Sequence, residues 1–279
     1  MHIDQIVGFD YLKRVMRTRF KKMLRPNYLT SGMKVPHGIV LSGPPGCGKT
    51  EFMSAVVETY CSDSNVFKVD VVDKSNIAKG QINETAKLVN KYFDEIRKDQ
   101  SKIHILYIDE ADDLFVTRKH NKSYASELTG ALLRNMEGFN SPNNYYILAA
   151  TNYEGNIDPA ILDRLELNYT VLPPSQIERK QLIELLITSK FDICDISEDW
   201  LIKWSGKMTQ GFTGRDFTKV QIRLDDILFE LQEIDENARI STLSVSMELT
   251  KQSGYITKSM NPRKHFKDKL EEYYETQLD

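Results

Sequence analysis

The stretch that decides the fold is residues 38–50, which read Gly-Ile-Val-Leu-Ser-Gly-Pro-Pro-Gly-Cys-Gly-Lys-Thr. Its first part, Ile39 to Ser42, is a short apolar run that predicts a buried strand. The turn that follows, Gly43 to Thr50, fits the pattern G-x-x-x-x-G-K-[ST] in full. Glycines let backbone N–H groups point inward around phosphate oxygens, and the N-terminus of a following helix adds partial positive charge. The stretch therefore predicts a P-loop that binds the phosphates of a nucleotide.

Two side chains of this loop have separate expected tasks. Lys49 is predicted to reach the β- and γ-phosphate oxygens, and Thr50 is predicted to ligate Mg²⁺. The ligands predicted from this loop are accordingly ATP and Mg²⁺. The residues expected to contact the nucleotide here are Pro45, Gly46, Cys47, Gly48, Lys49, Thr50 and Glu51.

Strand-like and helix-like stretches alternate from Gly38 to Leu172. Four more apolar runs predict strands, at 66–71, 103–108, 146–150 and 166–171. Such alternation with continuous apolar strands is typical of an α/β fold with a parallel sheet covered on both faces. Beyond Pro173 and Pro174 the periodicity is helical, although 241–260 is too polar and weakly periodic to assign, and a charged helix is predicted at 264–276. We therefore predict two domains, 1–172 and 173–279.

A pair of carboxylates follows the strand predicted at 103–108. Its apolar residues lead directly into Asp109 and Glu110. Ligands of parallel α/β sheets bind at the carboxyl ends of the strands, so both carboxylates are expected beside the P-loop. Asp109 is predicted to hold the metal through water, and Glu110 to polarise the attacking water as general base.

Two further candidates also have an ordinary structural explanation. Asn152 ends the next strand, where its amide either orients the attacking water or caps the following turn. Arg164 is either a surface cation or an arginine finger, which enters a neighbouring subunit's active site and neutralises charge on the transferred phosphoryl group. With Lys49 and Glu110, these residues form the predicted catalytic set.

Composition is that of an ordinary globular protein. The sequence is 41% hydrophobic and 28% charged, and its net charge of −3 creates no general attraction to nucleic acid or membrane. The charge is unevenly distributed, because the stretch from Tyr11 to Thr50 contains basic residues and no acidic ones. This stretch is either a solvated helix face or a docking surface for an acidic partner or nucleic acid.

Other features concern the cellular compartment. The three cysteines are isolated, the first ten residues lack a signal-peptide pattern, and no apolar run approaches the ~20 residues that span a bilayer. These features predict a cytoplasmic protein without a membrane span. His104, inside the apolar run at 103–108, is expected to be buried and hydrogen-bonded.

Together these motifs resemble the AAA ATPase family, which contains microtubule-severing, membrane-remodelling and unfoldase ATPases. Residues 38–50 resemble its Walker A region almost letter for letter, Asp109 and Glu110 match Walker B, and Asn152 matches sensor 1. The stretch from Thr151 to Arg164 resembles its second region of homology. The resemblance implies a P-loop NTPase with a three-layer parallel sheet, a helical lid domain and a ring, usually a hexamer.

The resemblance extends to both ends of the chain. Ile6, Val7 and Gly8 are similar to a family segment that lines the adenine pocket, and residues 210–216 resemble the lid motif G-F-S-G-A-D. This similarity places Gly214 and Arg215 among the expected nucleotide-binding residues. Arg215 stands where many members have Ala, and it is either a sensor of the γ-phosphate or a solvent-facing arginine.

Two other positions depart from the family pattern. Members with a shortened second region often keep two adjacent arginines, but Asp163 occupies the first position, which leaves Arg164 as the finger candidate. Members that thread polypeptide carry an aromatic residue in a pore loop, where this chain has Gln81 followed by Ile82. Either Ile82 grips a chain in its place, or this ring does not thread polypeptide.

The leading functional prediction is an ATP hydrolase that assembles as a homo-oligomeric ring and remodels, disassembles or unfolds a protein partner. Specificity would come from the basic first helix, the pore loops or an adaptor. One alternative is a nucleotide-switched machine on nucleic acid, against which the acidic net charge argues. Another is a weakly hydrolysing assembly scaffold, against which the intact Lys49, Asp109 and Glu110 argue.

Overall fold

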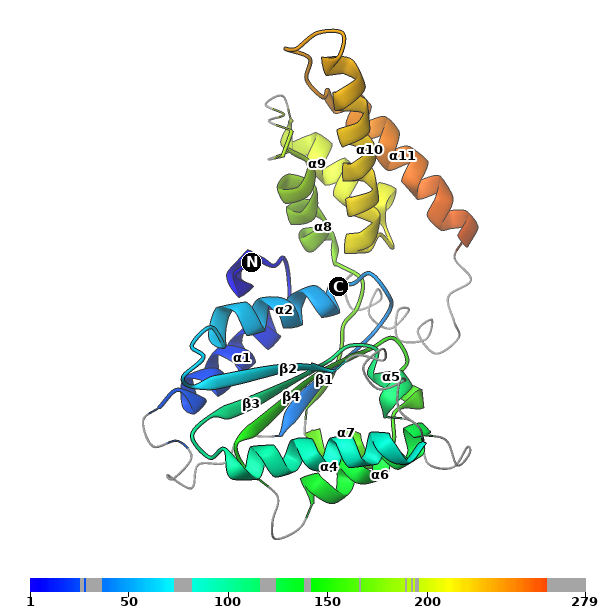
Figure 1. Ribbon diagram of the computed structural model, residues 1–279. Coiled ribbons are helices and arrows are strands. Elements are labelled where there is room, and N and C mark those ends of the chain that lie inside the picture. Colours follow the sequence, from blue (N-terminus) through cyan, green and yellow to red (C-terminus); the bar gives the residue numbers. More distant parts are fainter. Residues whose placement is uncertain are drawn as a thin grey trace. The chain divides into compact units, whose positions relative to one another are not determined.

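The computed structural model describes residues 1–25, 28, 37–72, 82–115, 124–137, 142–165, 167–188, 190–191, 193 and 196–259. Among these residues, five strands form one sheet (Figure 1): β1 Gly38–Ser42, β2 Phe67–Val72, β3 Ile103–Ile108, β4 Tyr145–Thr151 and β5 Asn168–Thr170. They lie in the order β2-β3-β4-β1-β5, and each neighbouring pair is parallel.

The central strands coincide with the apolar runs of the sequence. Every residue of β1, β3 and β4 is buried. A strand covered on both faces has no solvent-facing position, so its sequence is continuously apolar rather than alternating. The predicted α/β fold with a parallel sheet is confirmed.

Helices cover both faces of this sheet (Figure 1). One face carries α1 Asp10–Met23 and α2 Lys49–Tyr60, and the other carries α4 Ile82–Lys98, α6 Tyr124–Met136 and α7 Pro159–Leu165. The short helix α5 Ala111–Leu114 follows β3, and the short turns η1 Ile3–Gln5 and η3 Glu154–Asn156 precede α1 and α7. The result is a three-layer sandwich with its core on both sides of the sheet.

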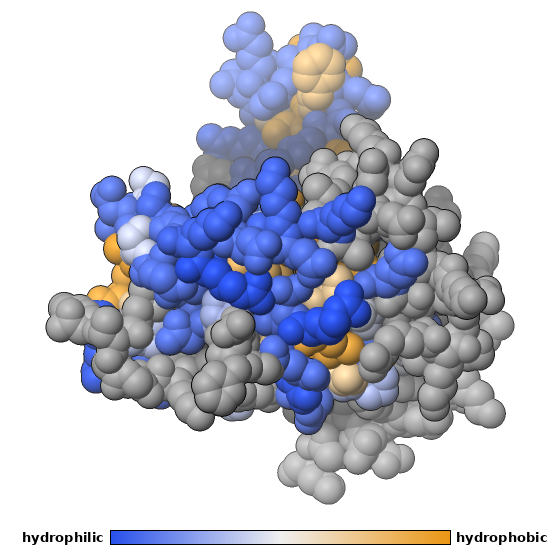
Figure 2. All heavy atoms as spheres, turned by 60° about the horizontal axis from the view of Figure 1, so that its bottom comes forward, coloured by the Kyte–Doolittle hydropathy of each residue, from blue (hydrophilic) through white to orange (hydrophobic). Residues whose placement is uncertain are grey.

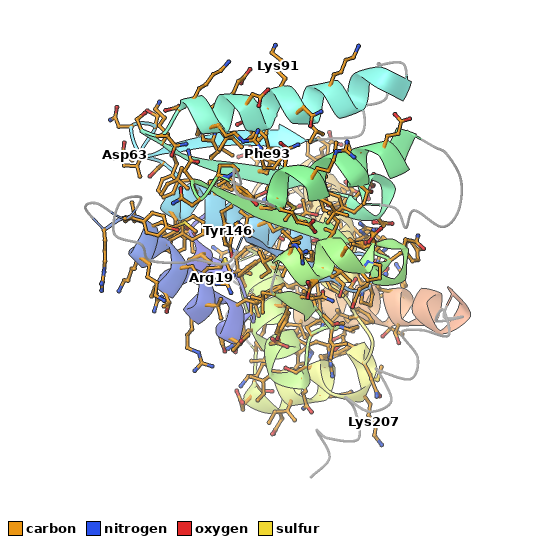
Figure 3. The ribbon with its side chains drawn as sticks, turned by 90° about the horizontal axis from the view of Figure 1, so that it is seen from below. Arg19, Asp63, Lys91, Phe93, Tyr146 and Lys207 are labelled. Carbon is orange, nitrogen blue, oxygen red and sulfur yellow. The ribbon has the colours of Figure 1, made fainter. Side chains whose placement is uncertain are left out.

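The helix α4 shows how sequence periodicity selects the covered face. Phe93 is fully buried and points toward the sheet, whereas Lys91 points away from it (Figure 3). The side on which α4 and α6 lie is mainly hydrophilic over its described residues (Figure 2). Apolar residues of both helices pack beneath that surface, among them Phe93, Ile96, Leu128 and Leu132.

The chain divides into two compact units. The first comprises Met1–Gly43 and Lys49–Val171, and the second comprises Pro44–Gly48 and the described residues from Leu172 onward. The second unit contains α8 Gln176–Ile183, the π-helical turn η4 Glu184–Thr188, α9 Glu198–Ser205, the turn η5 Lys207–Thr209, α10 Gly214–Gln232 and α11 Thr242–Ser259. It has its own core, which includes Trp204, Phe212, Phe217 and Leu224. The limits 1–172 and 173–279 stay a prediction.

The helix α11 was not assigned from sequence, because its inner face is partly polar. Glu248 and Gln252 are each only 2% exposed, and they interrupt the apolar periodicity. Their partners lie on α10, where the Arg223 Nε donates to Glu248 Oε2 at 2.7 Å and Asp216 Oδ1 accepts from the Gln252 amide at 2.7 Å. Buried polar groups of this kind persist because they are hydrogen-bonded.

Several predictions concern residues that the structure does not describe. Gln81, the side chain of Ile82 and the helix predicted at 264–276 all lie outside the described residues. Within the described part of the chain, no helix combines the length and apolar character needed to cross a membrane.

His104 is buried as predicted, but the predicted hydrogen bonding is wrong. Its side chain is 1% exposed, and neither ring nitrogen has a hydrogen-bond partner among the described residues. The nearest carboxylate oxygens, of Asp70 and Asp99, stop at 4.0 and 3.8 Å, because Asp70 accepts from the Tyr92 hydroxyl and Asp99 from Ser101. Burial, followed by the charge of Lys68, holds the pKa of His104 below its ordinary value, although Asp99 and Asp70 oppose this shift.

This histidine predicts a pH dependence of stability. Because the folded-state pKa lies below the unfolded value near 6.5, the unfolded chain binds the proton more readily. The contribution of His104 to the free energy of unfolding is therefore complete above the unfolded-state pKa. It is lost as pH falls from there toward the folded-state pKa, by no more than about 1.4 kcal/mol per pH unit. Urea unfolding followed by circular dichroism between about pH 7.5 and 5 measures the slope. His104→Leu should reduce the slope; an unchanged slope in that variant contradicts the assignment.

Candidate active site

The strand order creates a crevice at the carboxyl edge of the sheet. From β1 the chain passes through α2 to β2 at one edge, whereas from β4 it passes through α7 to β5 at the other. The connections from β1 and β4 therefore leave in opposite directions, which is the arrangement where ligands of open α/β sheets bind. Because β4 lies between β1 and β3, the residue after β4 is placed between those that follow the other two strands.

The P-loop turn depends on glycine at three positions. Gly43, Gly46 and Gly48 have φ of 145°, 83° and 84°, a region that side chains with a Cβ rarely adopt. At Gly43 space is also missing, since an added Cβ would lie 2.1 Å from the carbonyl oxygen of Val171. The loop can therefore follow this path only with these residues.

Hydrogen bonds within the protein hold Lys49 in position. It begins α2 and is only 6% exposed. Its Nζ donates to the carbonyl oxygen of Gly43 at 2.8 Å and to Asn152 Oδ1 at 2.9 Å. The turn after β4 is capped instead by Thr151, whose Oγ1 accepts the N–H of Tyr153. Asn152 thus faces the P-loop lysine.

The residues predicted to hold the metal also meet. Thr50 Oγ1 donates to Asp109 Oδ2 at 2.9 Å, and Asp109 Oδ1 accepts the N–H of Glu110 at 2.9 Å. Oxygen donors suit Mg²⁺, which usually keeps several waters and takes one or two carboxylates together with substrate phosphates. The described residues contain no group of three or more His, Cys, Asp or Glu able to hold a metal alone. Thr50 and Asp109 supply one hydroxyl and one carboxylate of this oxygen-donor kind.

Glu110 has an unusual backbone conformation. With φ 53° and ψ 44° it is left-handed, and Phe9 is the other non-glycine residue with positive φ among those described. Such conformations cost about 1–3 kcal/mol and concentrate at functional sites. The Glu110 side chain is exposed at the carboxyl edge of the sheet and forms no hydrogen bond to a described residue.

A family comparison agrees with this geometry. The model of the "ATPase family associated with various cellular activities (AAA)" matches residues 39–171, from β1 to the end of the sheet. Residues 39–171 therefore match the AAA family. The matched region contains the P-loop, the two carboxylates after β3 and the asparagine after β4.

Individual relatives are more distant. The chain is 27% identical over 272 residues to "Cell division protein C" of Sulfolobus acidocaldarius, a match covering 90% of the chain and 70% of that protein. It is 28% identical over 219 residues to "Vacuolar protein sorting-associated protein 4A" of Mus musculus and of Homo sapiens. Those matches cover 77% of this chain and 48% of each relative, so the chain spans about half the length of the latter proteins.

The segment predicted to line an adenine pocket is anchored to α2 of the AAA module. Ile6 is 9% exposed, Val7 is half-buried, and Gly8 has φ 75°. The next residue, Phe9, stacks on Phe52 of α2 with ring centroids 4.7 Å apart. The segment is thereby tied to the helix that begins with Lys49.

The predicted lid residues Gly214 and Arg215 begin α10 in the second compact unit, which includes Pro44–Gly48. Within that unit, the carbonyl oxygen of Gly46 accepts the N–H of Arg215 at 3.2 Å. The Arg215 side chain is exposed and has no hydrogen bond or ion pair with a described residue. Among the other predicted contact residues, Pro45 and Glu51 are exposed and Cys47 is buried.

Arg164 is not part of the site in its own chain. Its guanidinium donates to Glu137 Oε1 and to Asp163 Oδ2, both at 2.6 Å. It lies near the end of α7, and the chain continues from there to β5. These bonds tie Arg164 to neighbouring carboxylates and not to the residues of the P-loop.

Two carboxylates that sequence reasoning missed support the site. Glu154 accepts from Ser42 Oγ at 2.8 Å and from the Asn168 amide at 2.5 Å, so it joins the ends of β1 and β5 to the turn after β4. Asp112 accepts from Thr151 Oγ1 at 2.7 Å, which ties α5 to β4. Asp112 stands in no motif, and Glu154, although it lies within the stretch from Thr151 to Arg164, has no local pattern that marks its role.

Proposed function

We propose that this chain binds Mg-ATP at the carboxyl edge of its sheet and hydrolyses it. The observation that carries the proposal is one connected arrangement: Lys49 bonds to Asn152, Thr50 bonds to Asp109, and Glu110 follows Asp109. These side chains come from three strand ends that are far apart in sequence. The match of residues 39–171 to the AAA family, whose activity is ATP hydrolysis in general, supports the same conclusion.

Binding would replace protein contacts with phosphate contacts. The Lys49 ammonium, which donates to oxygens of Gly43 and Asn152, would donate instead to the β- and γ-phosphate oxygens. Thr50 and Asp109 would hold the metal, which neutralises charge on the phosphates. The P-loop backbone and the N-terminus of α2 would supply further N–H donors.

Hydrolysis needs a base and an orienting group. Glu110 would accept a proton as a water oxygen attacks the γ-phosphorus and the bond to the β–γ bridging oxygen breaks, which releases ADP and phosphate. Asn152 lies beside Lys49 and would orient that water. The exposed Glu110 carboxylate, without a partner among the described residues, is available for this task.

The proposal for the assembled state concerns Arg164. It pairs with Glu137 and Asp163 rather than with P-loop residues, and it would act as a finger in the site of a neighbouring subunit. Such head-to-tail contacts close into rings, and we propose a cytoplasmic homo-oligomer, usually hexameric, with residues 173–279 as lid. Changes in the angle between lid and sheet domain would then remodel a protein partner. The names of the relatives, in cell division and in vacuolar protein sorting, are compatible with that role.

The Lys49→Met variant tests the nucleotide site. The variant cannot form the two charge-assisted hydrogen bonds that Lys49 would donate to the β- and γ-phosphates. Each is worth about 1.5–3 kcal/mol, so ATP binding should weaken about 100-fold or more. The free energy of unfolding should change little. The variant loses the bonds of Lys49 to Gly43 and Asn152, but it also no longer buries an ammonium group. Titration with a fluorescent ATP analogue measures affinity, and thermal unfolding without nucleotide measures stability.

Lys91→Met is the matched control for that experiment. Lys91 lies on α4 and points away from the sheet (Figure 3), so its replacement should leave ATP affinity unchanged. If Lys49→Met binds ATP as tightly as the wild type does, the P-loop lysine does not contact phosphate. If the wild type binds Mg-ATP but never turns it over, the chain is a nucleotide-dependent scaffold.

A further inference from the structure

The helix α1 presents a stripe of unneutralised cations. Arg14, Lys21, Lys22 and Arg25 are exposed, and none forms an ion pair with a described residue. Arg14 and Lys21 are seven residues apart, which places them on one face of α1 about 10 Å apart along its axis, and Arg25 follows just beyond the end of the helix. Like charges at this spacing repel one another, so the folded chain alone gains little from the arrangement.

The other cations of α1 are used within the fold. Arg17 pairs with Asp4, and Lys13 donates to the carbonyl oxygen of Ile6. Arg19 reaches Tyr146, to whose hydroxyl its Nη1 donates at 2.6 Å (Figure 3). The exposed stripe is therefore distinct from the cations that hold α1 on the sheet.

A matching acidic surface lies at the end of α10. Residues 225–236 contain six carboxylates and no cation. Asp226, Glu230 and Glu233 are exposed and spaced by 4 and 3 residues, so they share one helix face. Asp225 lies outside this stripe, because it pairs with Lys190.

This acidic end opposes the helix dipole. The last turn of α10 contains no basic residue, although cations are favoured at a helix C-terminus and carboxylates are disfavoured there. The dipole explains Lys21 and Lys22 in the last turn of α1 but not the acidic end of α10. Beside these carboxylates, Phe229 is 67% exposed and Ile234 is 88% exposed. Large apolar side chains among uncompensated charges are typical of a surface that another molecule covers.

We propose that the acidic end of α10 in one copy of the chain docks on the basic stripe of α1 in a second copy. Both surfaces are largely helical, both are exposed, and their charges are opposite in sign. Phe229 and Ile234 would pack near the exposed Tyr11 and Leu24, which flank the basic stripe. Such a contact uses different surfaces on the two partners and therefore leads to a ring or an open chain. The inference rests on the proposed function in expecting copies to assemble, but it concerns association and not turnover.

Charge reversal on each side tests this contact. One variant carries Arg14→Glu and Lys21→Glu, and a second carries Glu230→Lys and Glu233→Lys. Each variant alone brings like charges together, so its self-association should weaken about tenfold or more at about 50 mM salt. An equimolar mixture should regain association, because each contact then joins opposite charges again. Sedimentation velocity, with and without Mg²⁺ and a non-hydrolysable ATP analogue, measures both effects.

A control variant and the mixture decide the outcome. Lys91→Glu with Lys98→Glu changes net charge as the first variant does, but on α4, and should associate like the wild type. The proposal is overturned if neither reversal weakens association or if the mixture fails to recover. Recovery only when all four reversals are placed in one chain would also overturn it, since the contact would then be intramolecular.

ATP binding and turnover, measured on the same samples, separate this proposal from the proposed function. If the mixture regains association but hydrolyses no ATP, the contact between α1 and α10 is supported and the proposed ATPase activity is contradicted. If hydrolysis rises with concentration but does not depend on these charges, the ATPase activity is supported and the contact is contradicted.

Discussion

Replacing Glu110 with Gln is expected to lower ATP turnover about 100- to 10,000-fold, the usual contribution of a general base. Gln has the same shape but accepts no proton from the attacking water. ATP affinity should stay the same or increase, because the variant removes a negative charge beside the phosphates. Phosphate release at saturating ATP gives the turnover, and equilibrium binding of a fluorescent ATP analogue gives the affinity.

A matched substitution separates this effect from a general change of charge. Glu95→Gln alters an exposed carboxylate on α4 and should hydrolyse ATP at the wild-type rate. Retention of more than about a tenth of the rate by Glu110→Gln would mean that another group accepts the proton.

Replacing Arg164 with Ala is expected to reduce turnover about 1,000-fold or more at concentrations where subunits assemble. The guanidinium would no longer neutralise the charge that develops on the transferred phosphoryl group in the neighbouring site. Its present pairs with Glu137 and Asp163 are solvent-exposed, and such pairs are worth only about 0–1 kcal/mol, so they do not prevent this use. The rate per subunit of the wild type should rise with concentration.

Mixing experiments show whether Arg164 acts between subunits. Added to the wild type, Arg164→Ala subunits should lower the rate by more than their share, because each disables a neighbour's site. Arg134→Ala, at an exposed position on α6, should dilute the activity only in proportion. If the wild-type rate does not depend on concentration and Arg164→Ala is fully active, Arg164 is not an arginine finger.

The sheet could be predicted because its signals are local. Strands such as β1 and β3 are buried on both faces, so their apolar character appears directly in a short run of residues. The helix α11 could not be predicted, because two of its buried positions are the polar residues Glu248 and Gln252. Their partners, Arg223 and Asp216, lie on another helix. A polar residue that is satisfied by a distant partner looks like a surface residue in sequence.

The same contrast holds at the candidate site. Lys49, Thr50 and Asp109 stand in motifs, and the structure brings them together with Asn152 and Glu110 at one edge. Their roles in binding and hydrolysis stay predictions that the variants above test. The supporting Glu154 could not be found, because its partner Ser42 is 112 residues away. Such pairings depend on strand order, which no single stretch of the sequence encodes.

The left-handed backbone at Glu110 gives this position two opposed requirements. Glycine adopts φ near 53° without the penalty of about 1–3 kcal/mol that a residue with a Cβ incurs there. A redesign that ranked substitutions by folding free energy alone would therefore favour Gly at 110, and it would delete the carboxylate that the proposed reaction needs. At position 110, selection for higher folding stability and selection for ATP hydrolysis would therefore favour different residues.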